Sequence, residues 1–221
     1  MKLLAVDTAL GACSVALLEN EQILAHIFEP MDRGHAERLA PMVEEAMRGV
    51  EFSALTRLAV TVGPGTFTGQ RVGLAFMRGL RLALKIPLVG TTTLEVMATA
   101  AAAETGLAKA AAIHDARRNE AYLLLKDGPD VVLQPIVLPF AQAVDRIRAF
   151  GPCALAGTGA AAAFETLFET LGANHALSSV RQPDALWAAR QARLMPEPQT
   201  VPGPLYLRAP DAKLPGGKAL V

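Results

Sequence analysis

The chain has 221 residues, with 21 Lys and Arg against 21 Asp and Glu, so its formal net charge of zero provides no overall positive field that would attract nucleic acid. A hydrophobic content of 52% and a mean hydropathy of +0.30 predict a substantial buried core and exclude a disordered chain. Because no signal-peptide pattern or membrane-length apolar run is found, we expect a cytoplasmic protein.

The first half of the chain predicts three strands followed by alternating helices and strands. Short β-type runs with brief links occur at 3–9, 14–20 and 22–28, which favours an antiparallel start. Apolar residues at helical spacing predict a helix over 35–50, in which Pro41 indicates either a kink or a start beside it. The elements expected next are a strand (57–62), a loop (63–73), a helix to about 85, a strand (87–91) and a helix (93–104).

The second half repeats this pattern at an offset of 108 residues, with Asp115 matching Asp7 and Leu123 matching Val15. We therefore expect two similar α/β domains, with ligands in the cleft between them. A Pro-rich tail follows, in which residues 204–208 are expected to be anchored and 213–221 loose. The predicted units are 1–104, 105–194 and 195–221, and the second unit contains the strands of 110–139, a helix (140–150), a strand (153–157) and helices (161–171 and 184–194).

Asp7 and Thr8 are the first candidates for chemistry. With Gly11 they occupy the turn after the first strand, where an ATP-cleaving two-domain protein would place a carboxylate for a metal and a hydroxyl for a phosphate. The pattern is short and unspecific, and it fits equally well two side chains that satisfy the backbone groups of the turn. Both interpretations stay open on the residues alone.

The loop GPGTFTGQRVG (63–73) has two interpretations as well. Its glycines, Gly63, Gly65 and Gly69, allow close approach of an anion, and Thr66 or Thr68 can cap the following helix. It lacks the Lys-Ser/Thr ending of a Walker A motif, so that class of phosphate loop is excluded. A tight strand-to-helix turn explains the same residues.

The helix after this loop has an unusual number of small residues. Each interior glycine costs about 1 kcal/mol of helix propensity, so close packing should compensate for it. The packing partner is either the chain's own sheet or a helix of another subunit. The small residues are Gly69, Gly73, Ala75, Gly79 and Ala83, and a basic edge is formed by Arg71, Arg78, Arg81 and Lys85.

The cysteines and histidines predict no catalytic or metal site. Cys13 and Cys153 lie in separate apolar runs and are expected to be buried, reduced thiols. No two of the four histidines have the spacing of a helical metal pair, and His35 is expected to bond to a turn. The absence of a G-x-S-x-G motif argues against a hydrolytic triad.

Six stretches that span almost the whole chain resemble one family. The family is TsaB (YeaZ), the dimerization subunit of the bacterial tRNA threonylcarbamoyladenosine machinery. Its loop is usually GPGSFTG followed by Val-Arg, whereas this chain has Thr66 for the serine and Gln70 for the valine. The matching stretches are LLAVDTALGACSVALL, RGHAERLAPMVEEAM, VGPGTFTGQRVGLAFMRGL, IPLVGTTTLEVMA, IHDARRNEAYLLL and PLYLR.

The resemblance implies two duplicated domains of the acetate and sugar kinase, Hsp70 and actin type (ASKHA), each with a mixed sheet flanked by helices. It also implies a subunit without catalytic residues, metal or intrinsic cofactor, because Thr93 and Met97 occupy the positions of the His-x-x-x-His metal pair in the sibling transferase TsaD. ATP and metal are then expected on partner subunits. A vestigial or weak nucleotide site would consist of Asp7, Thr8, Gly63, Gly65, Thr66 and Gly69.

The resemblance further implies a scaffold that pairs with TsaD, works with the ATPase TsaE, forms a homodimer in isolation and meets tRNA only through the complex. The complex transfers threonylcarbamoyl to N6 of adenosine 37 in tRNAs reading ANN codons. The alternatives are a small ATPase or kinase using Asp7, Thr8 and the 63–69 loop, or a protease acting on TsaD. The expected interface lies on helices 35–50 and 69–84, through Leu39, Val43, Met47, Val72, Gly73, Phe76, Gly79 and Leu80.

Overall fold

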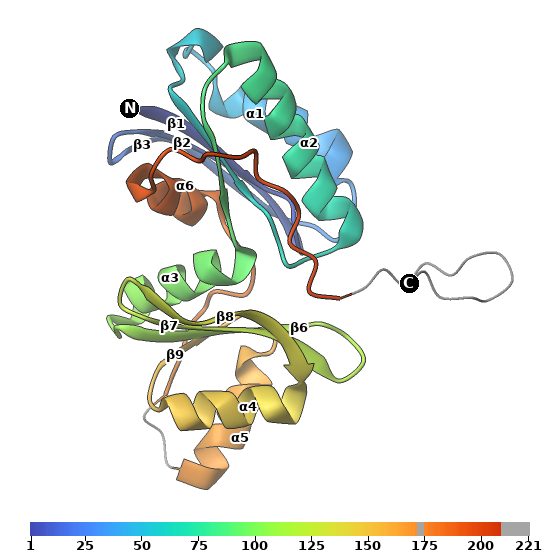
Figure 1. Cartoon of the computed structure of the whole chain (residues 1–221), viewed down its shortest axis with the longest axis vertical. Coiled ribbons are helices and arrows are strands. Elements are labelled where there is room, and N and C mark those ends of the chain that lie inside the picture. Colours follow the sequence, from blue (N-terminus) through green and yellow to red (C-terminus); the bar gives the residue numbers. More distant parts are fainter. Residues whose placement is uncertain (172–174, 209–221) are drawn as a thin grey trace, which may run out of the picture.

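A computed structural model describes residues 1–171 and 175–208 (Figure 1). Its first sheet has the order β3-β2-β1-β4-β5. β2 pairs antiparallel with β1 and β3, whereas β4 pairs parallel with β1 and β5, so the expected antiparallel start and mixed sheet are confirmed. The strands are β1 (Lys2–Asp7), β2 (Ala12–Glu19), β3 (Gln22–Pro30), β4 (Arg57–Thr61) and β5 (Leu88–Thr91).

The second sheet has the same topology, in the order β8-β7-β6-β9-β10. β7 begins and ends 108 residues after β2, which confirms the repeat found in the sequence. Among the strands of residues 1–171 and 175–208, only β10, a strand of two residues, was not expected. The strands are β6 (Lys109–Asp115), β7 (Glu120–Asp127), β8 (Asp130–Pro139), β9 (Ala154–Ala156) and β10 (Ala176–Leu177).

Helices cover both faces of both sheets. α1 (His35–Ala46) and α2 (Phe67–Leu84) pack on the outer face of the first sheet, near a 3-10 turn, η1 (Phe52–Ala54). α4 (Phe140–Phe150) and α5 (Ala160–Leu171) pack on the outer face of the second sheet. α3 (Thr93–Thr105) and α6 (Ala185–Leu194) lie between the two sheets, which gives five alternating layers (Figure 1).

The two middle helices do not follow the order of the sequence. α6 comes from the second half of the chain, yet its alanines pack on Leu3, Ala5 and Val89 of the first sheet. α3 precedes the second sheet and packs on it through Leu94 and Met97, while it also contacts α6. The division at 104/105 stays a prediction, and the helices between the sheets are shared by both lobes.

Local signals in the sequence explain where the helices begin. The side chain of Thr66 accepts a hydrogen bond from the amide of Gly69 at 3.0 Å and caps α2, as one of the two threonines was expected to do. Asp184 caps α6 in the same way. α1 begins at His35, so Pro41 lies within the helix and does not start it, and the helix ends four residues before the expected position 50.

The tail is anchored over a longer stretch than 204–208. Arg57 donates to the carbonyl of Met195 at 2.7 Å, and Arg78 donates to that of Pro202. The amide of Leu205 bonds to the carbonyl of Val62 at 2.7 Å. Arg208 then reaches the second lobe, where it bonds to the carbonyl of Ala116 at 3.0 Å. The expectation of a loose end over 213–221 lies outside the described residues.

Candidate functional site: a closed turn and an open cleft

The turn after β1 is packed directly onto the loop before α2. The hydroxyl of Thr8 donates to the carbonyl of Gly69 at 2.7 Å and accepts from the amide of Gly73 at 3.0 Å. A Cβ atom on Gly69 would lie 2.2 Å from the carbonyl oxygen of Thr8, and one on Gly65 would lie 2.3 Å from that of Ala9. These glycines are therefore required by contact between two backbone turns.

The same contacts use backbone amides of the loop that an anion would otherwise bind. The amide of Thr66 is bonded to the carbonyl of Ala9 at 2.8 Å, and the amide of Gly69 is bonded to the Thr66 hydroxyl. Gln70 is 2% exposed, and its side chain packs against Gly63. The structure brings together the six residues that were expected to bind a nucleotide, but they pack against one another. Their role in cofactor binding stays a prediction.

Asp7 is fully buried beneath this turn. Its Oδ1 accepts hydrogen bonds from the Thr61 hydroxyl and, at 3.4 Å, from the amide of Ala9. Its Oδ2 has no hydrogen-bond partner among the described residues. Burial raises the pKa of the carboxyl to about 7, against the lowering effect of the Thr61 bond. Asp7 is therefore partly protonated at neutral pH, which is unfavourable for a metal ligand.

Thr93 and Met97, which the resemblance was expected to place at a metal pair, are also used for packing. The Thr93 hydroxyl donates to the carbonyl of Pro64 at 2.6 Å, and the side chain is fully buried. Met97 is fully buried against Leu94 and Ala110. No group of three or more His, Cys, Asp or Glu side chains that could hold a metal occurs within residues 1–171 and 175–208.

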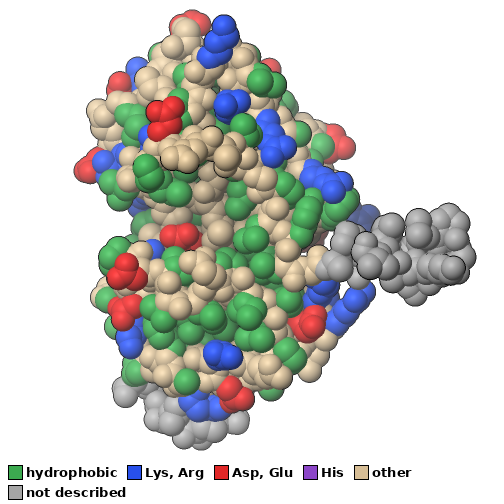
Figure 2. Space-filling model, in the orientation of Figure 1, with side chains coloured by type: hydrophobic (Ala, Val, Ile, Leu, Met, Phe, Trp, Pro, Cys, Tyr) green, Lys and Arg blue, Asp and Glu red, His purple; other side chains and the backbone are tan. Residues whose placement is uncertain are grey.

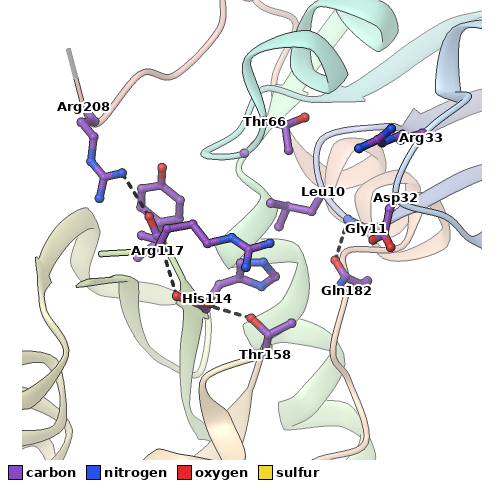
Figure 3. Close-up of a pocket in the computed structure, with 14 residues that line it drawn as sticks. Leu10, Gly11, Asp32, Arg33, Thr66, His114, Arg117, Thr158, Gln182 and Arg208 are labelled. Atoms are coloured by element: carbon purple, nitrogen blue, oxygen red, sulfur yellow. Dashed lines mark hydrogen bonds between the residues drawn. The ribbon is translucent and has the colours of Figure 1, made fainter. Parts of the chain in front are cut away.

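An open cleft of about 750 Å³ separates the lobes beside the closed turn (Figure 3). Leu10, Arg33 and Thr66 belong to its first-lobe wall, and His114 and Arg117 to its second-lobe wall. At one end of the cleft Gln182 accepts from the amide of Gly11 at 2.9 Å, and at the other Arg208 reaches across from the tail. The cleft lies between the duplicated halves, as the sequence predicted for a ligand site.

His114 is a cleft residue that the sequence did not single out. Its side chain is 6% exposed, and its Nδ1 has no hydrogen-bond partner among the described residues. Burial lowers the pKa of the imidazole to about 4, with Asp115 acting in the opposite direction and Arg117 adding to the decrease. The ring is therefore neutral at physiological pH.

Arg117 begins an unusual turn between β6 and β7. Arg117, Arg118 and Asn119 have φ values of 64°, 56° and 58°, so three consecutive non-glycine residues are left-handed. The amide of Arg117 bonds to Asp115 at 2.8 Å and that of Glu120 bonds to the carbonyl of Arg117 at 3.0 Å, which fixes the turn. The only signal in the sequence was Asn119, a residue type that tolerates this conformation.

The expected interface residues divide into buried and accessible ones. Leu39, Val43 and Met47 are 1%, 1% and 4% exposed and pack in the core of the first lobe, so their assignment to a partner surface is corrected. Gly73 is buried too, because its amide faces Thr8. Val72, Phe76 and Leu80 are partly buried on α2, and Gly79 is exposed. For these four residues the interface stays a prediction.

The expectations for cysteine and for His35 are confirmed. Cys13 and Cys153 are free and buried. Sγ of Cys153 lies 3.5 Å from Nδ1 of His175, a pairing that the sequence did not reveal, but burial raises the pKa of this thiol to about 12. A thiol in this state is a poor nucleophile. Nε2 of His35 bonds to the carbonyl of Leu10 at 3.0 Å, within the turn after β1.

Two mixed sheets of identical strand order, with shared helices and an intervening cleft, define a duplicated ASKHA fold. A ROK hexokinase from Thermus thermophilus has this fold as well, with a TM-score of 0.51 at 16% identity over 88% of this chain and 99% of the hexokinase. No helix of the described residues is long and apolar enough to cross a membrane.

The family is defined by closer similarities. YeaZ from Pseudomonas aeruginosa matches with a TM-score of 0.74 and 31% identity, over 86% of this chain and 90% of that protein. The family model TsaD, tRNA N6-adenosine threonylcarbamoyltransferase, matches residues 22–153. The chain belongs to the TsaB (YeaZ) family, which is related to TsaD.

A curated relative from Escherichia coli K12 is named tRNA threonylcarbamoyladenosine biosynthesis protein TsaB. It is 40% identical over 124 residues, which are 55% of this chain and 53% of that protein. The match therefore spans about half the length of this relative.

Proposed function

We propose that the chain is a non-catalytic subunit of tRNA threonylcarbamoyladenosine biosynthesis. In this role it binds TsaD, and TsaE with it, and so supports threonylcarbamoyl transfer to N6 of adenosine 37 in tRNAs reading ANN codons. Membership in the TsaB family and the name of the E. coli relative support the pathway. A net charge of zero agrees with tRNA being held by the assembled complex.

Gly79 is the observation that best supports a partner on α2. A Cβ atom added at Gly79 would meet nothing within 4 Å, so no contact inside the chain explains the glycine. A solvent-exposed glycine within a helix costs about 1 kcal/mol relative to alanine. Close approach of a second helix accounts for this cost, whereas Gly69 and Gly73 are explained by their contacts with Thr8.

The exposed surface around Gly79 suits such a contact. Ala75 and Ala83 are exposed on α2 near Gly79, and Leu82 is 71% exposed. Lys and Arg side chains gather over α2 (Figure 2), where the helix carries Arg71, Arg78, Arg81 and Lys85. Small and apolar residues beside cations favour a protein partner with a partly acidic face. The same surface would form the homodimer in isolation.

The state of Asp7 and Thr8 supports a subunit without ATPase or kinase chemistry. The Thr8 hydroxyl already donates to the carbonyl of Gly69 and accepts from the amide of Gly73, both on α2, and burial raises the pKa of the Asp7 carboxyl to about 7. In the proposed complex, ATP and metal are bound by the partner subunits. Cys153 gives no support to the protease alternative, since burial raises the pKa of its thiol to about 12.

The test is co-elution of the purified chain with TsaD from the same organism on size exclusion. We expect Gly79→Glu to abolish co-elution and Ala141→Glu, at an exposed position of α4, to preserve it. Circular dichroism of each variant checks the fold. A Gly79→Glu variant that folds and still co-elutes would exclude α2 as the interface. In a reconstituted tRNA assay, modification that proceeds without this chain would exclude the subunit role.

A further inference from the structure

The segment 195–208, which we call the strap, runs from the end of α6 past α2 to the second lobe without forming a helix or strand (Figure 1). Arg78 of α2 donates two hydrogen bonds to the carbonyl of Pro202, at 2.6 and 3.1 Å. Farther along, the amide of Leu205 bonds to the carbonyl of Val62 at 2.7 Å. Backbone groups of the strap are therefore fixed to the first lobe at more than one point.

An aromatic contact adds to this anchoring. The ring of Tyr206 stacks on that of Phe67, the first residue of α2, with 5.9 Å between the ring centroids. Nε of Arg71 donates to the hydroxyl of Tyr206 at 2.9 Å, and its guanidinium group lies 3.4 Å from the centroid of the Phe67 ring. The strap is therefore attached to the first lobe as far as Tyr206.

Arg208 makes the contact with the second lobe. Its guanidinium group donates to the carbonyl of Ala116 at 3.0 Å and forms an ion pair with the carboxylate of Glu120. Ala116 and Glu120 flank the turn at 117–119, and the amide of Ala116 bonds to the carbonyl of Glu120 at 2.9 Å. Arg208 therefore joins the strap to both ends of this turn (Figure 3).

The turn at 117–119 needs such a restraint. Its three residues are left-handed, a conformation that is unfavourable for residues other than glycine and especially for arginine, which has no local hydrogen bond to offset the cost. The carbonyl of Asn119 accepts from the amide of Phe140 at 2.9 Å, which fixes the turn to the start of α4. A restraint on the turn is thereby a restraint on the second lobe.

The contact of Arg208 forms readily and can be released without detaching the rest of the strap. Only Leu207 separates Arg208 from the anchored Tyr206, so the guanidinium group has a high effective concentration near Glu120. The side chains of Arg208 and Glu120 are 25% and 34% exposed, so salt screens their ion pair.

We propose that Arg208 is a releasable clasp that holds the two lobes at a fixed opening. In the clasped state the strap joins the lobes at one end of the cleft, and the hydrogen bond between Gly11 and Gln182 joins them at the other (Figure 3). When Arg208 is released, the strap stays on the first lobe as far as Tyr206, the cleft widens, and the turn at 117–119 relaxes. The clasp does not depend on the proposed subunit role.

Double electron–electron resonance between spin labels on the two lobes tests the clasp. The labels are attached to Glu44→Cys on α1 and Arg146→Cys on α4, both at exposed positions, and the two native cysteines are buried. We expect a narrow distance distribution with Arg208 intact, and a broader one that extends to longer distances for Arg208→Ala. Glu120→Gln should have the same effect, and adding it to Arg208→Ala should change nothing further.

Arg193→Ala is the matched control. It removes the ion pair of Arg193 with Glu21 at 3.0 Å, which joins α6 to the link between β2 and β3. Its distance distribution should match that of the labelled chain with Arg208 intact. An unchanged distribution for Arg208→Ala, or equal broadening by Arg193→Ala, overturns the proposal. Circular dichroism checks that each variant is folded.

Hydrogen exchange measured by mass spectrometry tests the effect on the turn. In Arg208→Ala the amides of 116–120 should exchange on the order of tenfold faster than in the wild type, because the turn opens more often. In about 1 M NaCl the exchange of the wild type should approach that of the variant, since salt screens the ion pair. Equal exchange in the two proteins at low salt would show that Arg208 does not hold the turn, and would overturn the clasp.

Discussion

The hydroxyl of Thr8 accepts a hydrogen bond from the amide of Gly73 at 3.0 Å, so the turn after the first strand is bonded directly to α2. A Cβ atom on Gly73 would lie 2.7 Å from the same hydroxyl oxygen. Gly73 and Gly79, six residues apart on α2, are therefore explained by different structural reasons. Gly73 serves the fold, whereas Gly79 faces open space.

Substituting alanine at each of the two positions distinguishes the two reasons, because the changes in stability should have opposite signs. Gly73→Ala should destabilise the isolated chain by about 1–3 kcal/mol, since the new methyl group overpacks the contact with Thr8. Gly79→Ala should stabilise it by about 0.5–1 kcal/mol through helix propensity. Urea unfolding at pH 7 measures both free energies. A stabilising Gly73→Ala would contradict the packing described here.

Asp7 predicts a pH-dependent stability. Its folded-state pKa of about 7 lies above the ordinary carboxyl value of 3.8, so the native state binds the proton more tightly and the free energy of unfolding falls as pH rises from about 4 to 7. Asp7→Asn should remove this dependence. The free energy of unfolding of the variant, taken relative to that of the wild type, should therefore increase by roughly 2–4 kcal/mol between pH 4 and pH 8. Asp130→Asn, at an exposed position, is the control. Parallel pH profiles for wild type and Asp7→Asn would refute the raised pKa.

His26 and Asp184 predict a second, smaller pH effect. Nε2 of His26 lies 2.8 Å from Oδ1 of Asp184, and this hydrogen bond raises the pKa of His26. The stabilisation is complete below the unfolded pKa near 6.5 and is lost as pH rises through the folded-state pKa. Because the pair is partly exposed, we expect about 0.5–1 kcal/mol. Unfolding of wild type and His26→Gln at pH 6 and pH 9 measures the difference, which should vanish at pH 9.

Both cysteines should be unreactive in the native state. Burial raises the pKa of Cys13 and of Cys153 to about 12, so very little thiolate exists at pH 8. Ellman's reagent should label neither thiol within minutes in buffer and both in denaturant. Cys153→Ala should reduce the denatured count from two to one. Rapid labelling of one native thiol would show that the Cys153–His175 pair is activated.

The sequence was sufficient to predict most of the fold. Hydrophobic periodicity located the strands and helices, and the matching positions of Asp7 and Asp115 predicted the second sheet. Which sheet a helix covers was not predictable, because α6 has the composition of an ordinary amphipathic helix and its contacts with Leu3 join distant parts of the chain. β10 consists of two residues, too few for a periodic pattern.

The candidate site was less accessible to prediction. Leu39 and Val43 show the same helical spacing whether they face the chain's own sheet or another subunit, and only the packing distinguishes these cases. The groups of the cleft come from several separate segments, so neither the unpaired Nδ1 of His114 nor its proximity to Arg117 has a local signature. The left-handed turn at 117–119 lacks glycine, the residue that usually indicates this conformation.

The position of α6 also sets the order in which the chain can mature during synthesis. The inner face of the first sheet, including Leu18 and Ala59, is covered by helix residues that are translated after position 184. When the ribosome has completed β5, that face is still without its cover. The first lobe therefore reaches its native burial only after nearly the entire polypeptide has emerged, and a nascent chain stalled before α6 presents an apolar surface suited to a chaperone.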